Sequence, residues 1–146
     1  AESGPLGTKL RDIAIPILCI ENGQYRNQGM TGTSLNTDFG AADTQTAVTI
    51  LPGASALVGD LSGNVTIART AGALGWAAPA ATALKGATQV GSPGHVAIFG
   101  YAKGVQMVGM VAPARRAGFA IREALAASLT ADGIKLFDLI LEWVMQ

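Results

Sequence analysis

The spacing of apolar and polar residues differs from one segment of the chain to the next, and this spacing predicts the secondary structure of each segment. Residues 13–20 form a continuous apolar run, which is typical of a parallel strand covered on both faces. Pro16 has no backbone N–H to donate, so it should lie near the start of this strand or on a sheet edge. Short helices are expected before and after the run, over residues 4–12 and 22–29. Residues 30–45 are small and polar, and turns are expected there.

The middle of the chain holds short segments of strand composition that are separated by glycine, proline and serine. These segments cover residues 46–51, 64–70, 74–78, 82–90, 95–101 and 114–120. The turn formers Ala102-Lys103-Gly104 predict that residues 105–112 return as the hairpin partner of the strand before them. A helical turn is expected within residues 52–61, and a short helix over residues 121–128.

The C-terminal segment has the clearest helical period in the chain. Thr130 can cap this helix, and Asp132 suits its first turn. One apolar face is formed by Ile134, Phe137, Leu141 and Val144. That face is widened by Leu136, Leu139, Ile140 and Trp143. A narrow polar stripe remains at Lys135, Asp138 and Glu142.

Together these patterns predict an α/β fold over residues 1–146, in one domain. The expected architecture is a mixed, partly parallel sheet with flanking helices, antiparallel hairpins in its second half, and an amphipathic C-terminal helix. The length of 146 residues suits one ordinary domain. No apolar run approaches the roughly 18 residues of a membrane span.

Composition restricts the chemistry that the chain can carry. A single Cys excludes an intrachain disulfide framework and Cys-based zinc sites, and a single His excludes sites that need two. We therefore expect no metal and no cofactor. Ten basic residues balance ten acidic ones, which argues against nucleic acid and membrane surfaces as partners.

The charges are nevertheless segregated along the chain. Residues 28–68 contain acids without any Lys or Arg, whereas residues 61–122 contain bases without any acid. The basic stretch can be interpreted as an anion-facing surface or as separate solvated side chains. The second interpretation is favoured, because charged runs usually serve solubility.

Glu21 is the best candidate for function, because it follows the strand predicted over residues 13–20. Ligands of open α/β sheets bind at the carboxyl ends of strands, so Glu21 could act as a general base or bind a hydroxyl, with Asn22, Tyr25 or Arg26 beside it. The alternative is a carboxylate that stabilises a helix N-terminus by about 0.3–1 kcal/mol. Cys19 is a candidate nucleophile in the same region, although a small buried hydrophobe is the favoured role.

Four more residues are candidates for catalysis or binding. His95 would serve Cys19 as a base only if the fold joins them, and a loop histidine is the favoured interpretation, because no Gly-x-Ser-x-Gly elbow exists. Arg115 and Arg116 are neighbours in a strand, so they should point to opposite faces. One of them could bind an anion together with Lys103, but a salt bridge with a carboxylate is favoured.

Several longer motifs carry a family resemblance. They are Ile15-Pro16-Ile17-Leu18-Cys19-Ile20-Glu21, Gly29-Met30-Thr31-Gly32, Leu61-Ser62-Gly63-Asn64-Val65, Ala97-Ile98-Phe99-Gly100-Tyr101, Ala112-Pro113-Ala114-Arg115-Arg116, Leu129-Thr130-Ala131-Asp132-Gly133, Leu136-Phe137-Asp138 and Trp143. The pattern resembles an accessory domain of bacterial, often secreted, multidomain proteins. That domain is similar to the trehalose-utilisation-protein-like group of the class I glutamine-amidotransferase-like, or flavodoxin-like, folds.

The resemblance implies that the chain starts inside the domain, because the family has an extra strand–helix–strand portion before the first helix. The strand over residues 13–20 would then lack its usual neighbours. An uncovered apolar strand favours aggregation, so another copy or a missing segment should cover it. We therefore expect a homodimer or other self-association through the first strand or the C-terminal helix. A secreted location is favoured only by the resemblance.

The motifs that carry the resemblance concern packing and turns, and none is a catalytic signature. The expected function is therefore a non-catalytic accessory or interaction module of unknown ligand, with a carbohydrate or a small anion as candidate ligands. The alternative is a hydrolase or amidotransferase-like enzyme with its site at the strand–helix junction around Glu21.

Overall fold

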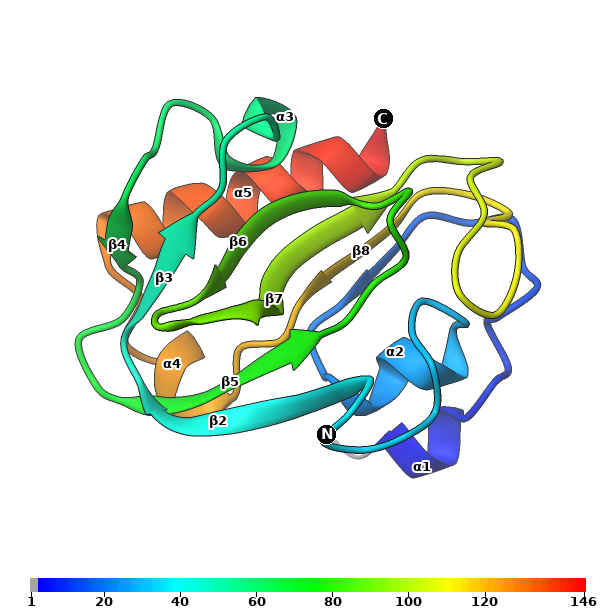
Figure 1. Cartoon of the computed structure of the whole chain (residues 1–146), viewed down its shortest axis with the longest axis horizontal. Coiled ribbons are helices and arrows are strands. Elements are labelled where there is room, and N and C mark those ends of the chain that lie inside the picture. Colours follow the sequence, from blue (N-terminus) through cyan, green and yellow to red (C-terminus); the bar gives the residue numbers. More distant parts are fainter. Residues whose placement is uncertain (1–2) are drawn as a thin grey trace.

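An eight-stranded mixed sheet runs through the computed structural model of the chain, which describes residues 3–146 (Figure 1). Its strands are β1 (Ile17–Cys19), β2 (Phe39–Gln45), β3 (Ala47–Ile50), β4 (Asn64–Thr66), β5 (Gly72–Ala77), β6 (Leu84–Gln89), β7 (Ser92–Tyr101) and β8 (Arg116–Phe119). The main path follows the order β1-β8-β7-β6-β3-β4, and β5 joins β2 to β7. The β1–β8 ladder is parallel, and the other ladders in the described residues are antiparallel.

The described residues form five helices, and those after the first lie against the sheet. The five are α1 (Ser3–Leu6), α2 (Gly23–Asn27), α3 (Ser55–Val58), α4 (Glu123–Ala126) and α5 (Ala131–Met145). Neighbouring residues Ile98 and Phe99 of β7 belong to two different hydrophobic clusters, which therefore lie on opposite faces of the sheet. Side chains from α3, α4 and α5 fill the first cluster, whereas α2 and long loops cover the second. The predicted mixed α/β architecture with flanking helices is confirmed.

The apolar run over residues 13–20 is mostly not a strand, so that part of the prediction was wrong. Within this run only β1 pairs with another strand, β8, and β1 is an edge strand of the sheet. Ile13, Ile15 and Ile20 are between 43% and 54% exposed. The Arg116 guanidinium donates to the carbonyl oxygens of Ile13 and Ile15, so these carbonyls bind a side chain instead of a neighbouring strand. Pro16 directly precedes β1, as predicted for a residue without an N–H.

Three other segments differ from their predictions. The helix expected over residues 4–12 is limited to α1, and turns follow over residues 7–12. β2 occupies residues expected to form turns, because it gains its stability from β5, where the Trp76 indole packs on Gly40. Residues 105–112 do not return as a hairpin strand. They form a loop whose Gly109 donates its N–H to the carbonyl of Gly29 and whose Met107 is buried. The strand that pairs with β7 on that side is β8.

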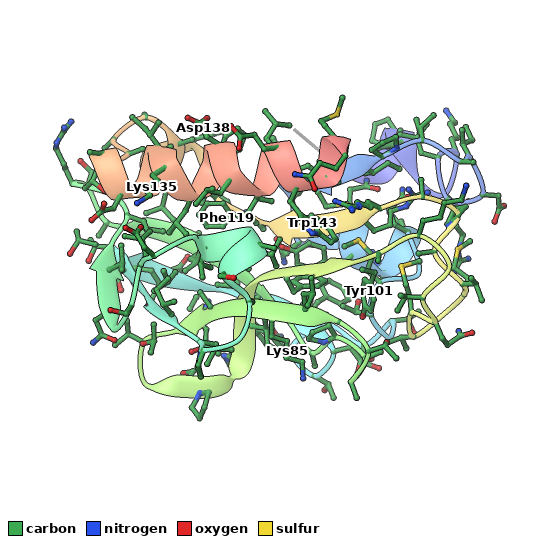
Figure 2. The ribbon with its side chains drawn as sticks, turned by 90° about the horizontal axis from the view of Figure 1, so that it is seen from above. Lys85, Tyr101, Phe119, Lys135, Asp138 and Trp143 are labelled. Carbon is green, nitrogen blue, oxygen red and sulfur yellow. The ribbon has the colours of Figure 1, made fainter. Side chains whose placement is uncertain are left out.

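The helix α5 lies on the sheet through part of the expected apolar face, centred on the residues expected to widen it and including buried Val144. Leu136, Ile140 and Trp143 are buried, whereas Ile134 and Leu141 are 51% and 41% exposed. Buried positions therefore recur at the helical period from Gly133, where the helix lies close against the backbone of Ile67, the residue after β4. Figure 2 shows Trp143 between α5 and the sheet, and Asp138 on the outer side of the helix.

The N-terminus of α5 is capped as predicted, and this bond supports a first mutational test. The hydroxyl of Thr130 accepts the N–H of Gly133 at 3.0 Å and donates to the carbonyl of Thr66 at 2.7 Å. Thr130→Ala should therefore lower the free energy of unfolding by about 1 kcal/mol, the usual contribution of a cap. Thr130→Ser is the matched control, since it keeps the hydroxyl. Urea unfolding measures both, and an equal loss in the two variants would contradict a role for the cap.

Candidate functional site

The carboxyl ends of β1 and β8 lie side by side, because these two strands are parallel and in register. Glu21 and Asn22 follow β1 closely, and Arg122 follows β8. The Nη2 atom of Arg122 donates to Oδ1 of Asn22 at 3.3 Å, which joins the two strand ends. Asn22 is only 5% exposed, whereas Arg122 is exposed. A buried amide thus holds an accessible guanidinium at the edge where α/β sheets bind ligands.

The strand β5 supports this edge from the side. The backbone N–H of Arg122 donates to the carbonyl of Ala73, and the N–H of Gly75 donates to that of Ala120. A Cβ at Gly75 would lie 2.4 Å from the Cβ of Ala120 and 3.0 Å from that of Asn22. Only glycine therefore allows β5 to approach the two strand ends this closely.

Three polar residues belong to this edge: Arg122 with its guanidinium, Asn22 with its carboxamide and Glu21 with its carboxylate. No ion pair joins Arg122 to Glu21. Among residues 3–146, the ion pair within 4 Å is that of Lys135 with Asp60, far along the chain from the edge. Glu21 is half-buried, and no ion pair within 4 Å joins its carboxylate to Arg122. Such a mixed set of donors and acceptors suits hydroxyl groups. No group of three His, Cys, Asp or Glu able to hold a metal occurs in the described residues.

Cys19 and Tyr25 lie beneath this edge and cannot reach a ligand. Cys19 is 4% exposed, and its Sγ lies 3.8 Å from Sδ of Met30. Burial raises the pKa of the Cys19 thiol to about 12, although the nearby charge of Arg116 lowers it in part. Tyr25 is fully buried edge-on against Phe99, and burial also raises its pKa. The Cys19 thiol is therefore protonated and shielded at neutral pH.

His95 lies in another part of the sheet. Cys19 aligns with Gly118, which aligns with Phe99, and His95 precedes Phe99 by four residues on β7. With about 4.8 Å between strands and about 3.3 Å per residue, the backbones of Cys19 and His95 are roughly 16 Å apart. The fold therefore does not bring the candidate nucleophile and base together.

The His95 ring has its own set of contacts. It stacks on Trp76, with 3.8 Å between ring centroids and 3° between planes. The amide of Gln89 donates to the carbonyl of Leu74, so its oxygen faces Nδ1 of His95 at 3.3 Å. Nδ1 is consequently the atom that carries the proton in neutral His95. These contacts give the imidazole a packing role between β5, β6 and β7.

The basic candidates do not converge on a common anion. Arg115 donates to the carbonyl of Trp143 and to Oε1 of Gln146, and its guanidinium lies 4.8 Å from the Trp143 ring. Arg115 therefore stabilises the C-terminus of α5, where the helix dipole favours a cation. Arg116 is fully buried and bonds only to backbone carbonyls, and Lys103 is exposed in a turn.

The salt bridge favoured for Arg115 or Arg116 is absent from the described residues, so this interpretation was wrong. Backbone carbonyl oxygens replace the expected carboxylate in both cases. The two side chains were predicted to point to opposite faces of one strand, but only Arg116 lies in β8. Arg115 contacts the C-terminus of α5, whereas Arg116 contacts the backbone of residues 11–15.

The burial of Cys19 supports a prediction about its reactivity. In the native protein, the thiol should react with a chromogenic disulfide reagent far more slowly than a free thiol, because the thiolate is scarce and access is blocked. In concentrated urea the same chain should release one equivalent of chromophore at once, which is the control. Fast stoichiometric labelling of the folded protein would contradict the assignment of Cys19 as a buried, protonated thiol and would support Cys19 as a nucleophile.

Sequence reasoning missed two residues, Arg122 and Trp76, and only the first had a usable signal. Arg122 follows the strand predicted over 114–120 at the same kind of position as Glu21 follows its own strand, so pairing the two strands would have revealed it. Trp76 had no local signal, because its partner His95 is distant in sequence. A shallow hollow elsewhere, lined by Leu51, Pro52 and Leu84 among others, contains none of the candidate residues.

No helix within residues 3–146 combines the length and the apolar character needed to cross a bilayer. Comparisons with known proteins add no relative to this picture. No protein-family model, curated protein or solved structure matches the chain. The geometry at the carboxyl ends of β1 and β8 is therefore the basis on which function can be argued.

Proposed function

We propose that the chain is a non-catalytic binding module that takes a small hydroxyl-rich ligand, such as a carbohydrate, at the carboxyl ends of β1 and β8. The observation that carries this proposal is the hydrogen bond from Arg122 to buried Asn22 across the two strand ends. That bond uses one nitrogen of a guanidinium with five N–H donors, so donors remain for a ligand. Glu21 directly precedes Asn22 in the sequence, so we expect its carboxylate to add acceptors beside this bond.

The composition of this edge favours hydroxyls over a simple anion. An anion would bind the Arg122 guanidinium but would be repelled by the half-buried carboxylate of Glu21. A sugar hydroxyl both donates and accepts, so neighbouring hydroxyls can use guanidinium, carboxylate and amide at once. The proposal is non-catalytic because Cys19 and His95, the groups an enzyme would use, are engaged elsewhere.

Thermal unfolding with a panel of mono- and disaccharides tests the proposal, with phosphate as the anion arm. A saccharide at ten times its Kd should stabilise the fold by about 1.4 kcal/mol, which raises Tm by several degrees. Arg122→Ala should abolish the shift. The matched control is Lys85→Ala, which removes a cation from β6 and should leave the shift intact.

Three results would overturn the proposal. The first is no shift with any saccharide of the panel at tens of millimolar, and the second is a shift that Arg122→Ala leaves unchanged. The third is turnover of chromogenic glycosides or amides that disappears in Glu21→Gln, because this would make the same edge an active site. If phosphate raised Tm and no saccharide did, the ligand of this edge would be an anion and the proposed hydroxyl-rich ligand would be wrong.

A further inference from the structure

Two exposed apolar patches of opposite charge lie on different parts of the molecule. The first, here called the basic end, joins the segment before β1 to the loop after β7 (Figure 1). It consists of Lys9, Arg11, Ile13, Ile15, Lys103, Val108 and Val111. The second, here called the acidic helix face, is the outer stripe of α5. It consists of Ile134, Asp138, Leu141, Glu142 and Met145.

The basic end is held together by specific contacts. The N–H of Gly109 donates to the carbonyl of Gly29, and a Cβ placed on Gly109 would lie 3.1 Å from Nη2 of Arg11. The Arg11 guanidinium therefore touches the loop that carries Val108 and Val111, which are 47% and 50% exposed. Apolar side chains and cations thus share one surface.

The segment before β1 completes the basic end. Ile13 and Ile15 are 44% and 43% exposed, because Arg116 binds their carbonyls and turns this segment away from the sheet. Asp12 is the acid of this surface, so Lys9, Arg11 and Lys103 leave it net positive. Nothing in residues 3–146 covers these side chains.

The acidic helix face has the complementary composition. Ile134, Leu141 and Met145 are 51%, 41% and 66% exposed and fall on one stripe of α5. Asp138 and Glu142 lie within and beside that stripe, and Figure 2 shows Asp138 directed away from the sheet. The nearby cation Lys135 is already paired with Asp60. The stripe is therefore apolar and net negative.

We propose that the chain associates with a second copy of itself head to tail, the basic end of one copy against the acidic helix face of the next. Opposite charges then meet around apolar side chains, which steers association and fixes the partner surface. A twofold contact of either patch with itself would instead bring like charges together, which is unfavourable. The contact therefore joins unlike patches. It closes into a reciprocal twofold dimer or a larger ring if the rotation between copies permits, and it forms an open chain otherwise.

This association should be weak. Stable interfaces bury about 800 Å² on each partner, whereas each patch here contributes only a few half-exposed side chains. A concentration of roughly 0.1–1 mM is therefore needed to populate dimers and larger species. The charged rims also predict that raising NaCl to 0.5 M weakens association roughly tenfold, because the Debye length falls to about 4 Å.

Mixing two variants tests the head-to-tail geometry. Leu141→Arg/Glu142→Lys disables the acidic helix face, and Lys103→Glu/Val108→Asp disables the basic end. Each variant alone should sediment as a monomer at concentrations where the wild type associates. An equimolar mixture should form a one-to-one heterodimer and nothing larger, because one intact copy of each face remains. Asp43→Lys, an exposed charge reversal on β2 outside both patches, should associate like the wild type.

The outcomes separate this geometry from its alternatives. A mixture that stays monomeric while the wild type associates would overturn the proposal in favour of a different contact. A wild type that remains monomeric at 1 mM would overturn it as well. If that monomer sediments with vesicles of anionic lipid, and Lys103→Glu/Val108→Asp abolishes this, the basic end is a membrane contact instead.

Discussion

Arg116→Ala is expected to lower the free energy of unfolding by about 3–5 kcal/mol, because it leaves buried carbonyl oxygens without a donor and removes a long buried side chain. Arg116 is fully buried, and its guanidinium donates to the carbonyls of Ile15 at 2.5 Å, Ile13 at 2.9 Å and Arg11 at 3.4 Å. Each carbonyl left without a donor costs about 1–3 kcal/mol where water cannot replace the arginine. The loss of the long side chain leaves a cavity as well.

Burial lowers the pKa of Arg116, but an arginine remains charged in proteins at neutral pH. Its charge is therefore neutralised by carbonyl dipoles instead of by a carboxylate. Arg116→Lys keeps the charge but cannot span the same set of carbonyls, because an ammonium is a compact donor without a planar fork. We expect it to recover only part of the loss.

Arg115→Ala is the matched control for Arg116→Ala. Arg115 is the next residue and also binds carbonyls, but its partners lie at the more exposed C-terminus of α5. Its removal should cost about 1 kcal/mol or less, as for a cation near a helix C-terminus. Urea unfolding gives the free energies, and limited proteolysis reports release of residues 11–15. Equal losses for the two variants would contradict the special role of Arg116.

The same side chain explains where sequence reasoning reached its limit. The apolar run over residues 13–20 has the composition of a buried strand, and periodicity alone could not reveal that an arginine about 100 residues later holds its first half out of the sheet. Strand β2 was missed for a similar reason, because its stability comes from Trp76 on β5 instead of its own residues. Local composition predicts a helix or strand correctly only when the contacts from residues distant in the sequence favour the same structure.

The elements predicted correctly are those whose own residues determine their structure. Residues 96–101 of β7 are mostly apolar and are buried on both faces, and α5 has a cap and a sustained helical period. For the site, the end of a strand located Glu21 and Asn22, but Arg122 required knowing that β8 runs parallel beside β1. The rotation of α5 was likewise set by the closeness of its backbone to the sheet at Gly133.

Gly133→Ala should destabilise the protein, although the same change in a solvated helix usually stabilises it by about 0.8–1 kcal/mol. A Cβ at Gly133 would lie within van der Waals overlap of the carbonyl oxygen of Ile67. That oxygen belongs to the backbone, and it cannot move away freely because it accepts the N–H of Thr130 at 2.9 Å. The helix must therefore shift outward, and overpacking of this kind costs about 1–3 kcal/mol or more in addition to the lost propensity gain.

Gly94→Ala is the matched control for Gly133→Ala, because nothing lies within 4 Å of the added Cβ. It should change the free energy of unfolding by less than about 0.5 kcal/mol, as for an unstrained surface change. If Gly133→Ala instead stabilised the protein, α5 would be free to move from Ile67 and the buried face of the helix would not be set by this contact. Destabilisation by Gly133→Ala alone would show that a close backbone approach, more than the apolar stripe of the helix, decides which side of α5 remains outside for a partner.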